Sequence, residues 1–240
     1  AIDSFAPAEI GELFQRSFNV QFNPALWHWK YQLGGGKCVV ARARSGAPIV
    51  AHYGGAPRRI QYFGQPATAI QVCDVMVLPE TRRQYGRSSL FFRTAATFLE
   101  REIGNSVNHL LGFGFPNQKA MNIAKRLNLY EKTDDFVELI LPPLESALPI
   151  VALDADAAER SIDRLWKRMA VDFAAGIIGD RDSNYFQYRY GDHPYGRDGL
   201  YRLVSVGDDD PIAVAVLKQH AEHWLVMDVI AAREDLVIVL

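Results

Sequence analysis

The first 141 residues alternate between helical and strand-like hydrophobic patterns. Ile10, Leu13 and Phe14 recur at the spacing of one helix face. Residues 67–77 instead form a long, mostly apolar run, which is typical of a buried strand. The same patterns predict helices at 4–18, 23–31, 86–102 and 116–127, and strands at 37–44, 49–55, 58–63, 67–77, 108–115 and 136–141. This order predicts an α/β fold in which helices flank a mixed, mostly antiparallel sheet.

The later part of the chain repeats some of this order. Residues 188–190 (Tyr-Arg-Tyr) echo residues 29–31 (Trp-Lys-Tyr). Residues 224–229 echo residues 72–77, so that Asp228 stands where the first stretch has its own aspartate. The echoes lie 159 residues apart (190 against 31) and 154 residues apart (228 against 74), and their common order indicates a duplication.

The two copies define the expected domain organisation. We predict a first domain over residues 1–141, a proline-rich linker at 142–149 and a partial, degenerate repeat over 150–240. The repeat lacks the glycine-containing turn of the first copy and stops inside an apolar run at 236–240. We therefore expect the sequence to be a fragment of a longer chain.

Composition narrows the class of protein without identifying it. Among 240 residues, 26 are lysine or arginine and 28 are aspartate or glutamate, which gives a net charge of −2. This balance predicts no general affinity for nucleic acid or for an anionic membrane. No apolar run of about 20 residues is present, so we expect no membrane span. Cys38 and Cys73 both lie in apolar runs, and we expect reduced thiols in a cytoplasmic protein.

A basic turn follows the predicted strand at 67–77. Residues 83–89 (Arg-Gln-Tyr-Gly-Arg-Ser-Ser) lie between that strand and the predicted helix at 86–102. Backbone N–H groups at the start of a helix bind anions, and Gly86 allows a ligand to approach closely. The stretch therefore predicts an anion site.

Residues 77–80 (Val-Leu-Pro-Glu) and the turn resemble the GNAT superfamily of acyl-CoA-dependent N-acyltransferases. That family carries a (Gln/Arg)-x-x-Gly-x-(Gly/Ala) turn between its fourth strand and third helix. Here serine occupies the last small position, and one residue is inserted. Counting forward from Pro79 selects Arg82 as the arginine of the motif. Counting back from Gly86 selects Arg83, and we prefer Arg83. The resemblance implies that the CoA pyrophosphate contacts Arg83, Gln84, Tyr85, Gly86, Arg87, Ser88 and Ser89.

The resemblance covers roughly residues 8–141 and implies two further contacts. In the family, an asparagine near the start of the fourth helix contacts the pantetheine arm, and Asn117 stands at that position. The family's fourth and fifth strands splay apart and hold the acyl arm between them. The backbone of Val75, Met76 and Val77 would then hold the pantetheine and polarise the thioester carbonyl. Asn117 as a plain helix cap is the alternative.

The sequence indicates the catalytic residues less clearly than the cofactor contacts. Many members of the family use a tyrosine seven residues after the asparagine, and Ala124 occupies that position here. Asp74 is the candidate general base, because it lies just before the implied acyl site. Its alternative is a structural side chain that faces a loop or pairs with an arginine, and its echo at Asp228 favours that alternative.

The leading hypothesis is an acyltransferase that moves an acetyl or other acyl group from acyl-CoA to an amine of an unknown small-molecule acceptor. It needs no metal. The alternatives are a non-catalytic acyl-CoA-binding or interaction module and a Fem-type aminoacyl transferase, which takes its acyl group from aminoacyl-tRNA. The sequence leaves open the acyl length and the oligomeric state, with a homodimer as one option.

Overall fold

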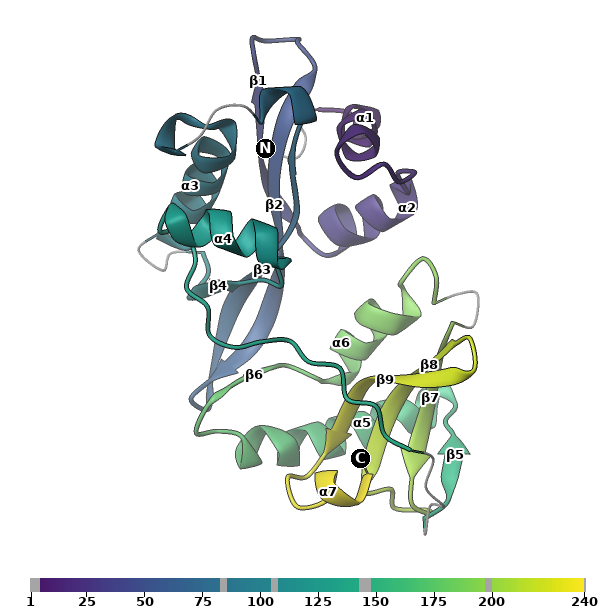
Figure 1. Ribbon diagram of the computed structural model, residues 1–240. Helices are drawn as coiled ribbons and strands as arrows, with labels where there is room; N and C mark the ends of the chain where they lie inside the picture. Colours follow the sequence, from purple (N-terminus) through teal and green to yellow (C-terminus); the bar gives the residue numbers. More distant parts are fainter. Residues whose placement is uncertain (1–4, 83–85, 105–107, 143–147, 197–199, 240) are drawn as a thin grey trace. The chain divides into compact units, whose positions relative to one another are not determined.

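The protein is described by a computed structural model that covers residues 5–82, 86–104, 108–142, 148–196 and 200–239. The chain forms two compact units (Figure 1). Unit 1 comprises Ala1–Arg58 and Thr68–Leu139, and unit 2 comprises Arg59–Ala67 and Ile140–Leu240. Within the described part of the chain, no helix has the length and apolar character needed to cross a membrane.

Unit 1 is a sheet between helices. Its elements are α1 (Pro7–Phe18), α2 (Pro24–Trp27), the π-helix η2 (His28–Leu33), β1 (Lys37–Arg42), β2 (Ile49–Tyr62), β3 (Gln65–Val77), η3 (Pro79–Thr81), η4 (Gly86–Ser88), α3 (Leu90–Glu102), β4 (Leu111–Phe113) and α4 (Gln118–Arg126). The strands lie in the order β1-β2-β3-β4. β1 pairs antiparallel with β2, and β4 pairs parallel with β3. Phe63 and Gly64, both with positive φ, form the turn of the β2–β3 hairpin.

The two faces of this sheet carry separate apolar cores, both built from buried side chains. One core joins α1, α2 and η2 to the sheet through Ile10, Leu13, Trp27, Tyr31, Cys38, Ile49, Met76 and Leu78. The other joins α3 to the opposite face through Tyr53, Ile70, Ala95 and Phe98. Figure 1 shows α1 and α2 on one side of β2 and α3 on the other. The predicted α/β fold, with helices flanking a mostly antiparallel sheet, is confirmed.

Unit 2 has a sheet of its own. Its elements are β5 (Ile150–Ala152), α5 (Ala155–Asp172), β6 (Ile177–Gly179), α6 (Ser183–Phe186), the π-helix η6 (Gln187–Gly191), β7 (Tyr201–Val206), β8 (Ala213–His220), β9 (His223–Ala231) and α7 (Leu236–Val239). The strands β5, β7, β8 and β9 form an antiparallel sheet in that order. α5 packs on it through Ile162, Leu165, Trp166 and Met169. β6 pairs instead with residues 60–62 at the end of β2.

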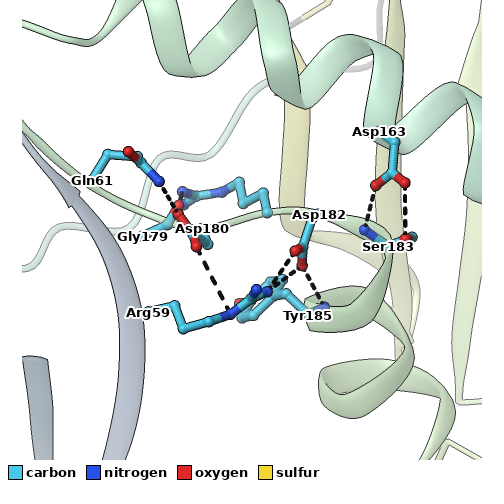
Figure 2. A network of polar contacts seen from close by, with 9 residues as sticks. Arg59, Gln61, Asp163, Gly179, Asp180, Asp182, Ser183 and Tyr185 are labelled. Atoms are coloured by element: carbon cyan, nitrogen blue, oxygen red, sulfur yellow. Dashed lines mark hydrogen bonds and ion pairs between the residues drawn. The ribbon is translucent and has the colours of Figure 1, made fainter. Parts of the chain in front are cut away.

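A polar network fixes residues 59–67 within unit 2 (Figure 2). The Arg59 guanidinium donates to both carboxylate oxygens of Asp182, at 2.5 and 2.6 Å. The Gln61 amide donates to Asp180 at 2.9 Å. Asp182 also caps α6 by accepting the Tyr185 N–H at 2.9 Å. One carboxylate thus serves both the hairpin and the helix start.

The predicted strand at 136–141 is wrong. Residues 130–142 have no regular secondary structure, and Phe136 and Ile140 are 86% and 88% exposed. A run of apolar residues becomes a stable strand only when a neighbouring strand satisfies its backbone groups. In the described ranges, no strand pairs with this stretch. The predicted strand at 108–115 likewise shortens to Leu111–Phe113.

Candidate functional site

The candidate site begins at an open edge of β3. β4 pairs with β3 only between Ala69 and Gln71. Beyond that point, the described residues place no strand on this edge of β3 up to its end at Val77. The opposite edge stays joined to β2, since the Leu78 N–H donates to the Val50 carbonyl at 2.9 Å. Strand pairing thus leaves a stretch of backbone that a ligand can contact.

The predicted backbone contacts lie on this open stretch. Met76 is buried in the core under α1 and α2, and Val75 packs against the core under α3. Their side chains therefore anchor the strand on both faces and leave only backbone at the edge. The Val77 carbonyl accepts the Arg82 Nε–H at 2.8 Å. Arg82, the rival candidate for the motif arginine, thus folds back on the strand end.

α3 is the next α-helix after β3, and it starts at Leu90 after the short helices η3 and η4. Gly86 has a φ of +73°, a conformation that favours glycine. Ser89 caps the helix, because its Oγ accepts the Phe92 N–H at 3.2 Å and donates to the Gly86 carbonyl at 2.7 Å. Arg87 lies with its guanidinium carbon 5.9 Å from the centre of the Phe92 ring. A capped helix start with a nearby cation favours an anion.

Three residues of the predicted turn lie outside the described residues, namely Arg83, Gln84 and Tyr85. Their contribution to the anion site stays a prediction. Ser88, the departure from the family pattern, lies in the short helical turn η4 just before α3. The structure thus describes Gly86 to Ser89 of the predicted pyrophosphate contacts.

Asn117 is found at the start of α4. Its Oδ1 accepts the Ala120 N–H at 2.9 Å, so the asparagine is a helix cap in this structure. It also lines a cavity of about 920 Å³ in unit 1. Most of the lining is apolar, including Val72 of β3, Phe113 and Phe115. The size is typical of small-molecule sites.

The cavity does not include every predicted contact. Asn117 and Val72 share its wall, whereas Gly86 to Ser89 and Val75 to Val77 are not part of its lining. The predicted site therefore divides between the cavity beside β4 and the edge of β3 that leads to α3.

Asp74 lies inside β3 and is surrounded by partners from two other elements. Lys30 donates to its carboxylate at 2.7 and 2.9 Å, and the Tyr31 hydroxyl donates at 2.8 Å. His52 Nδ1 lies 2.6 Å from the Asp74 backbone carbonyl. Sequence reasoning missed all three partners. The echo of residues 29–31 at 188–190 was a signal that could have pointed to Lys30 and Tyr31.

These contacts set the protonation states around Asp74. Burial raises the pKa of Asp74, but the Lys30 ammonium and the hydrogen bonds from Lys30 and Tyr31 outweigh it and hold that pKa below its usual value. Burial lowers the pKa of His52. Burial and the neighbouring carboxylate raise the pKa of Cys73 to about 12, so its thiol is a poor nucleophile at neutral pH. An ion-paired carboxylate with a low pKa is also a weak base.

The position that holds a catalytic tyrosine in many family members is closed. Ala124 is completely buried in α4. Tyr130 lies after the helix, where its hydroxyl contacts the Tyr53 hydroxyl of β2. Burial raises the pKa of both phenols. Tyr130 also lines the cavity. Two protonated phenols therefore lie in or next to the cavity wall.

Unit 2 contains a similar buried carboxylate. Asp228 of β9 accepts hydrogen bonds from Arg181 at 2.8 Å, from Tyr190 at 3.1 Å and from Tyr185 at 3.2 Å. Tyr190 belongs to the π-helix η6, as Tyr31 belongs to the π-helix η2. A buried aspartate held by a cation and a tyrosine is therefore common to both units.

Comparison with known proteins gives a family match for part of the chain and structural matches for nearly all of it. Residues 6–116 match the model of the acetyltransferase (GNAT) domain family. Among proteins of curated function, none matches this sequence. Among solved structures, a probable N-acyltransferase from Enterococcus faecalis matches with a TM-score of 0.65 and 10% identity, over 96% of this chain and 57% of that chain. A GCN5-related N-acetyltransferase from Kribbella flavida matches with a TM-score of 0.61 and 12% identity, over 97% of this chain and 56% of that chain.

A third match is Saccharomyces cerevisiae N-myristoyltransferase with bound myristoyl-CoA, with a TM-score of 0.51 and 10% identity, over 93% of this chain and 59% of that one. The chain thus spans little more than half of the length of the structures that it matches. The family match identifies an acetyltransferase (GNAT) domain over residues 6–116, and the structural matches show that the chain shares the fold of these solved structures.

Proposed function

We propose that this chain binds an acyl-CoA along the open edge of β3 and transfers the acyl group to an amine. The observation that carries the proposal is the stretch from Val72 to Val77, whose edge beyond β4 has no partner strand among the described residues, followed along the chain by the capped start of α3. Backbone groups at the edge can hydrogen-bond an extended amide-containing arm, as a neighbouring strand would. The helix start then receives the pyrophosphate.

The cofactor contacts follow from this placement. Arg83 to Ser89 would hold the pyrophosphate, the backbone of Val75 to Val77 would hold the pantetheine, and Asn117 would contact the same arm from α4. Acetyl-CoA is the proposed co-substrate, with a longer acyl-CoA as the alternative. A GNAT-fold neighbour that carries bound myristoyl-CoA supports acyl-CoA as the ligand class.

The reaction needs little from the protein beyond positioning. The neutral amine nitrogen attacks the thioester carbonyl carbon and forms the C–N bond, the C–S bond breaks, the nitrogen gives up one proton, and the departing thiolate takes up one proton to give an amide and free CoA. Backbone N–H groups that face the carbonyl oxygen would stabilise the negative charge that develops there. The prediction that Asp74 is the base stays a prediction, and its ion pair with Lys30 favours the structural alternative.

We further propose that unit 2 is a second, degenerate copy that binds no cofactor. Its support is the shared order of a capped short helix, a π-helix and antiparallel strands, with Asp228 at the place of Asp74. Unit 2 would then shape the acceptor site or stiffen the enzyme. The acceptor is proposed to be a small molecule, and its identity is open.

Calorimetric titration with acetyl-CoA tests the proposal directly. We expect binding in the micromolar to low millimolar range, with thiol release when an amine library is added. Folded protein that shows no heat of binding at millimolar acetyl-CoA would contradict the proposal. Desulfo-CoA, which keeps the pyrophosphate, serves as a positive control for the anion site.

A second candidate is an acyl-CoA-binding module without catalysis. The buried Ala124 at the family's tyrosine position and the ion-paired Asp74 favour it. Both candidates predict binding, but only an enzyme releases CoA thiol in the presence of an amine. Turnover with any acceptor would exclude the second candidate.

A further inference from the structure

We propose that Lys30, Tyr31 and His52 form a clamp on Asp74 that holds a kink in β3 and thereby orients the backbone of Val75 to Val77 toward the acyl carbonyl. Asp74 is then a positioning residue for the transfer reaction. This inference rests on the proposed function, because it assigns a role at the same strand edge.

The kink is an unusual backbone conformation. Asp74 has a φ of +51°, in the left-handed region that non-glycine residues seldom adopt, and it lies within β3. A single left-handed residue rotates the peptide groups that follow it and bends the strand. Such a conformation persists only where surrounding contacts determine it.

The clamp contacts both the side-chain carboxylate and the backbone carbonyl of Asp74. Lys30 and Tyr31 hold the carboxylate at 2.7 and 2.8 Å. His52 holds the backbone carbonyl at 2.6 Å. Because a carbonyl can only accept, this contact requires the proton on His52 Nδ1. The three partners come from η2 and β2, so the contacts join Asp74 to two other elements.

The room for this clamp is provided by Gly54 of β2. A β-carbon at that position would lie 2.2 Å from the Tyr31 hydroxyl and 2.7 Å from His52 Cε1. Any other residue would therefore displace two members of the clamp. The His52 ring also packs edge-on against Trp27 and Tyr31, with ring centres 5.5 and 5.8 Å away. Close packing from both β2 and the aromatic rings thus restricts the movement of the clamp.

The kink lies where the strand edge becomes free. Gln71 is the last residue of β3 that pairs with β4, and Val75 is the first predicted backbone contact for the acyl arm. Asp74 lies between them. A change in the backbone conformation of Asp74 would therefore alter the direction of the N–H groups that follow it at the open edge. The pairs between β3 and β4 lie before Asp74 in the chain and would be less affected.

Unit 2 shows that the carboxylate contacts alone do not require this kink. Asp228 has a cation and two tyrosines as partners, yet it is not among the described residues with positive φ. It pairs with Val216, and the irregularity of β9 is an extra residue between Val226 and Asp228. Of the two equivalent aspartates, only Asp74 is left-handed, and it lies in the unit that carries the predicted acyl-CoA site.

The test measures the bound thioester carbonyl by infrared spectroscopy with isotope-labelled acetyl-CoA. In the unaltered protein we expect the carbonyl stretch to move to lower frequency on binding, because oriented N–H groups polarise it. In Asp74→Asn we expect that shift to be lost while CoA affinity stays unchanged. Thiol release should show kcat lower by on the order of 10²-fold with little change in KM for acetyl-CoA.

Matched variants separate positioning from folding. Tyr31→Phe is a milder change that removes one clamp contact and should give a smaller loss of the same kind. Lys30→Met should resemble Asp74→Asn, and Lys30→Arg should restore the carbonyl shift in part. Asp228→Asn removes the equivalent charge in unit 2 and should leave the carbonyl frequency and kcat unaltered.

The outcomes distinguish this inference from the proposed function. Absence of acetyl-CoA binding to the unaltered protein would overturn both. Normal binding with an unshifted carbonyl, or an Asp74→Asn variant that keeps both the shift and kcat, would overturn the clamp alone. Equal losses in Asp228→Asn and Asp74→Asn would also overturn it, because they would point to general destabilisation.

Discussion

At the scale of single residues, the main feature is a buried ion pair. The Asp74 carboxylate is 15% exposed, and Lys30 supplies its only charged partner among the described residues. Removing one member of a buried pair leaves the other charge without compensation, which costs much more than the intact pair contributes. The sequence suggested an arginine as the partner of Asp74, but the partner is Lys30, which lies 44 positions away.

Lys30→Met should therefore destabilise the protein strongly. We expect the free energy of unfolding to fall by about 3 kcal/mol, because Asp74 would lose its cation within the core. Urea denaturation followed by tryptophan fluorescence measures this change. Lys132→Met is the matched control, since Lys132 pairs with Asp135 on the surface and should cost less than about 1 kcal/mol. Similar losses in both variants would contradict the buried pair.

The pH dependence of stability follows from His52. Its pKa is lowered in the folded protein by burial, and Lys30 also disfavours its charged form, although Asp74 opposes this effect. Below the ordinary histidine pKa of about 6.5, the unfolded chain binds a proton that the folded chain resists. Stability must then fall as the pH drops through that value, by up to about 1.4 kcal/mol per pH unit. The lowered pKa of Asp74 has the same sign but acts only at more acidic pH.

Denaturation curves between about pH 5 and pH 8 measure this dependence on both sides of the ordinary histidine pKa. We expect His52→Gln to flatten the part of the curve that His52 causes, because glutamine cannot take up the proton. An equally steep curve in that variant would assign the dependence to another group.

At the scale of elements, the hydrophobic pattern predicted the helices and most strands but not their exact form. Residues 28–33 form a π-helix in which the Gly34 N–H bonds to the Trp29 carbonyl, five residues earlier. Apolar spacing over six residues cannot separate this geometry from an α-helix. The π-helix matters because adjacent residues, Lys30 and Tyr31, both reach Asp74. Local sequence could suggest the helix cap at Asn117, but it could not predict the contacts of Asp74 with a distant helix and strand.

Gly86→Val tests the element that joins β3 to α3. Among the residues that the structure describes, none would come within 4 Å of a β-carbon at Gly86, so the variant should fold. Its φ of +73° is nevertheless strained for a β-branched residue, and the added methyl groups would stand where the phosphate approaches. We expect CoA affinity to fall by more than about tenfold, or about 1.4 kcal/mol.

Gly46→Val is the control for backbone strain alone. Gly46 lies in the turn between β1 and β2 and has a φ of +75°, and a β-carbon there would likewise meet no atom within 4 Å. The two variants should lose similar stability, measured by thermal unfolding. Equal CoA affinity in both would place the anion site elsewhere.

At the scale of the whole molecule, each compact unit is built from two separate stretches of chain. Residues 59–67 comprise the end of β2, the turn and the start of β3, and they belong to unit 2 although the rest of both strands belongs to unit 1. Sequence patterns predicted the linker at 142–149 from its prolines, and that boundary stays a prediction. They could not predict the pairing of residues 60–62 with β6, because the two segments lie more than 110 residues apart and both are short. Local periodicity carries no information on such long-range pairs.

The contacts of Asp182 with Arg59 and with the start of α6 should contribute a measurable part of the free energy of unfolding. Asp182→Ala removes both the partner of Arg59 and the cap of α6, so we expect a loss of about 2 kcal/mol, of which the cap contributes about half. Arg59→Met removes the ion pairs with Asp182 and Asp180 but keeps the helix cap, and it should cost less than about 1 kcal/mol because the Arg59 side chain is half exposed. Hydrogen exchange should accelerate at residues 60–62 in both variants, and at the start of α6 only in Asp182→Ala. Both variants leave the backbone hydrogen bonds between residues 60–62 and β6 intact. Unchanged exchange at 60–62 would therefore show that these bonds hold the hairpin without the Asp182 carboxylate.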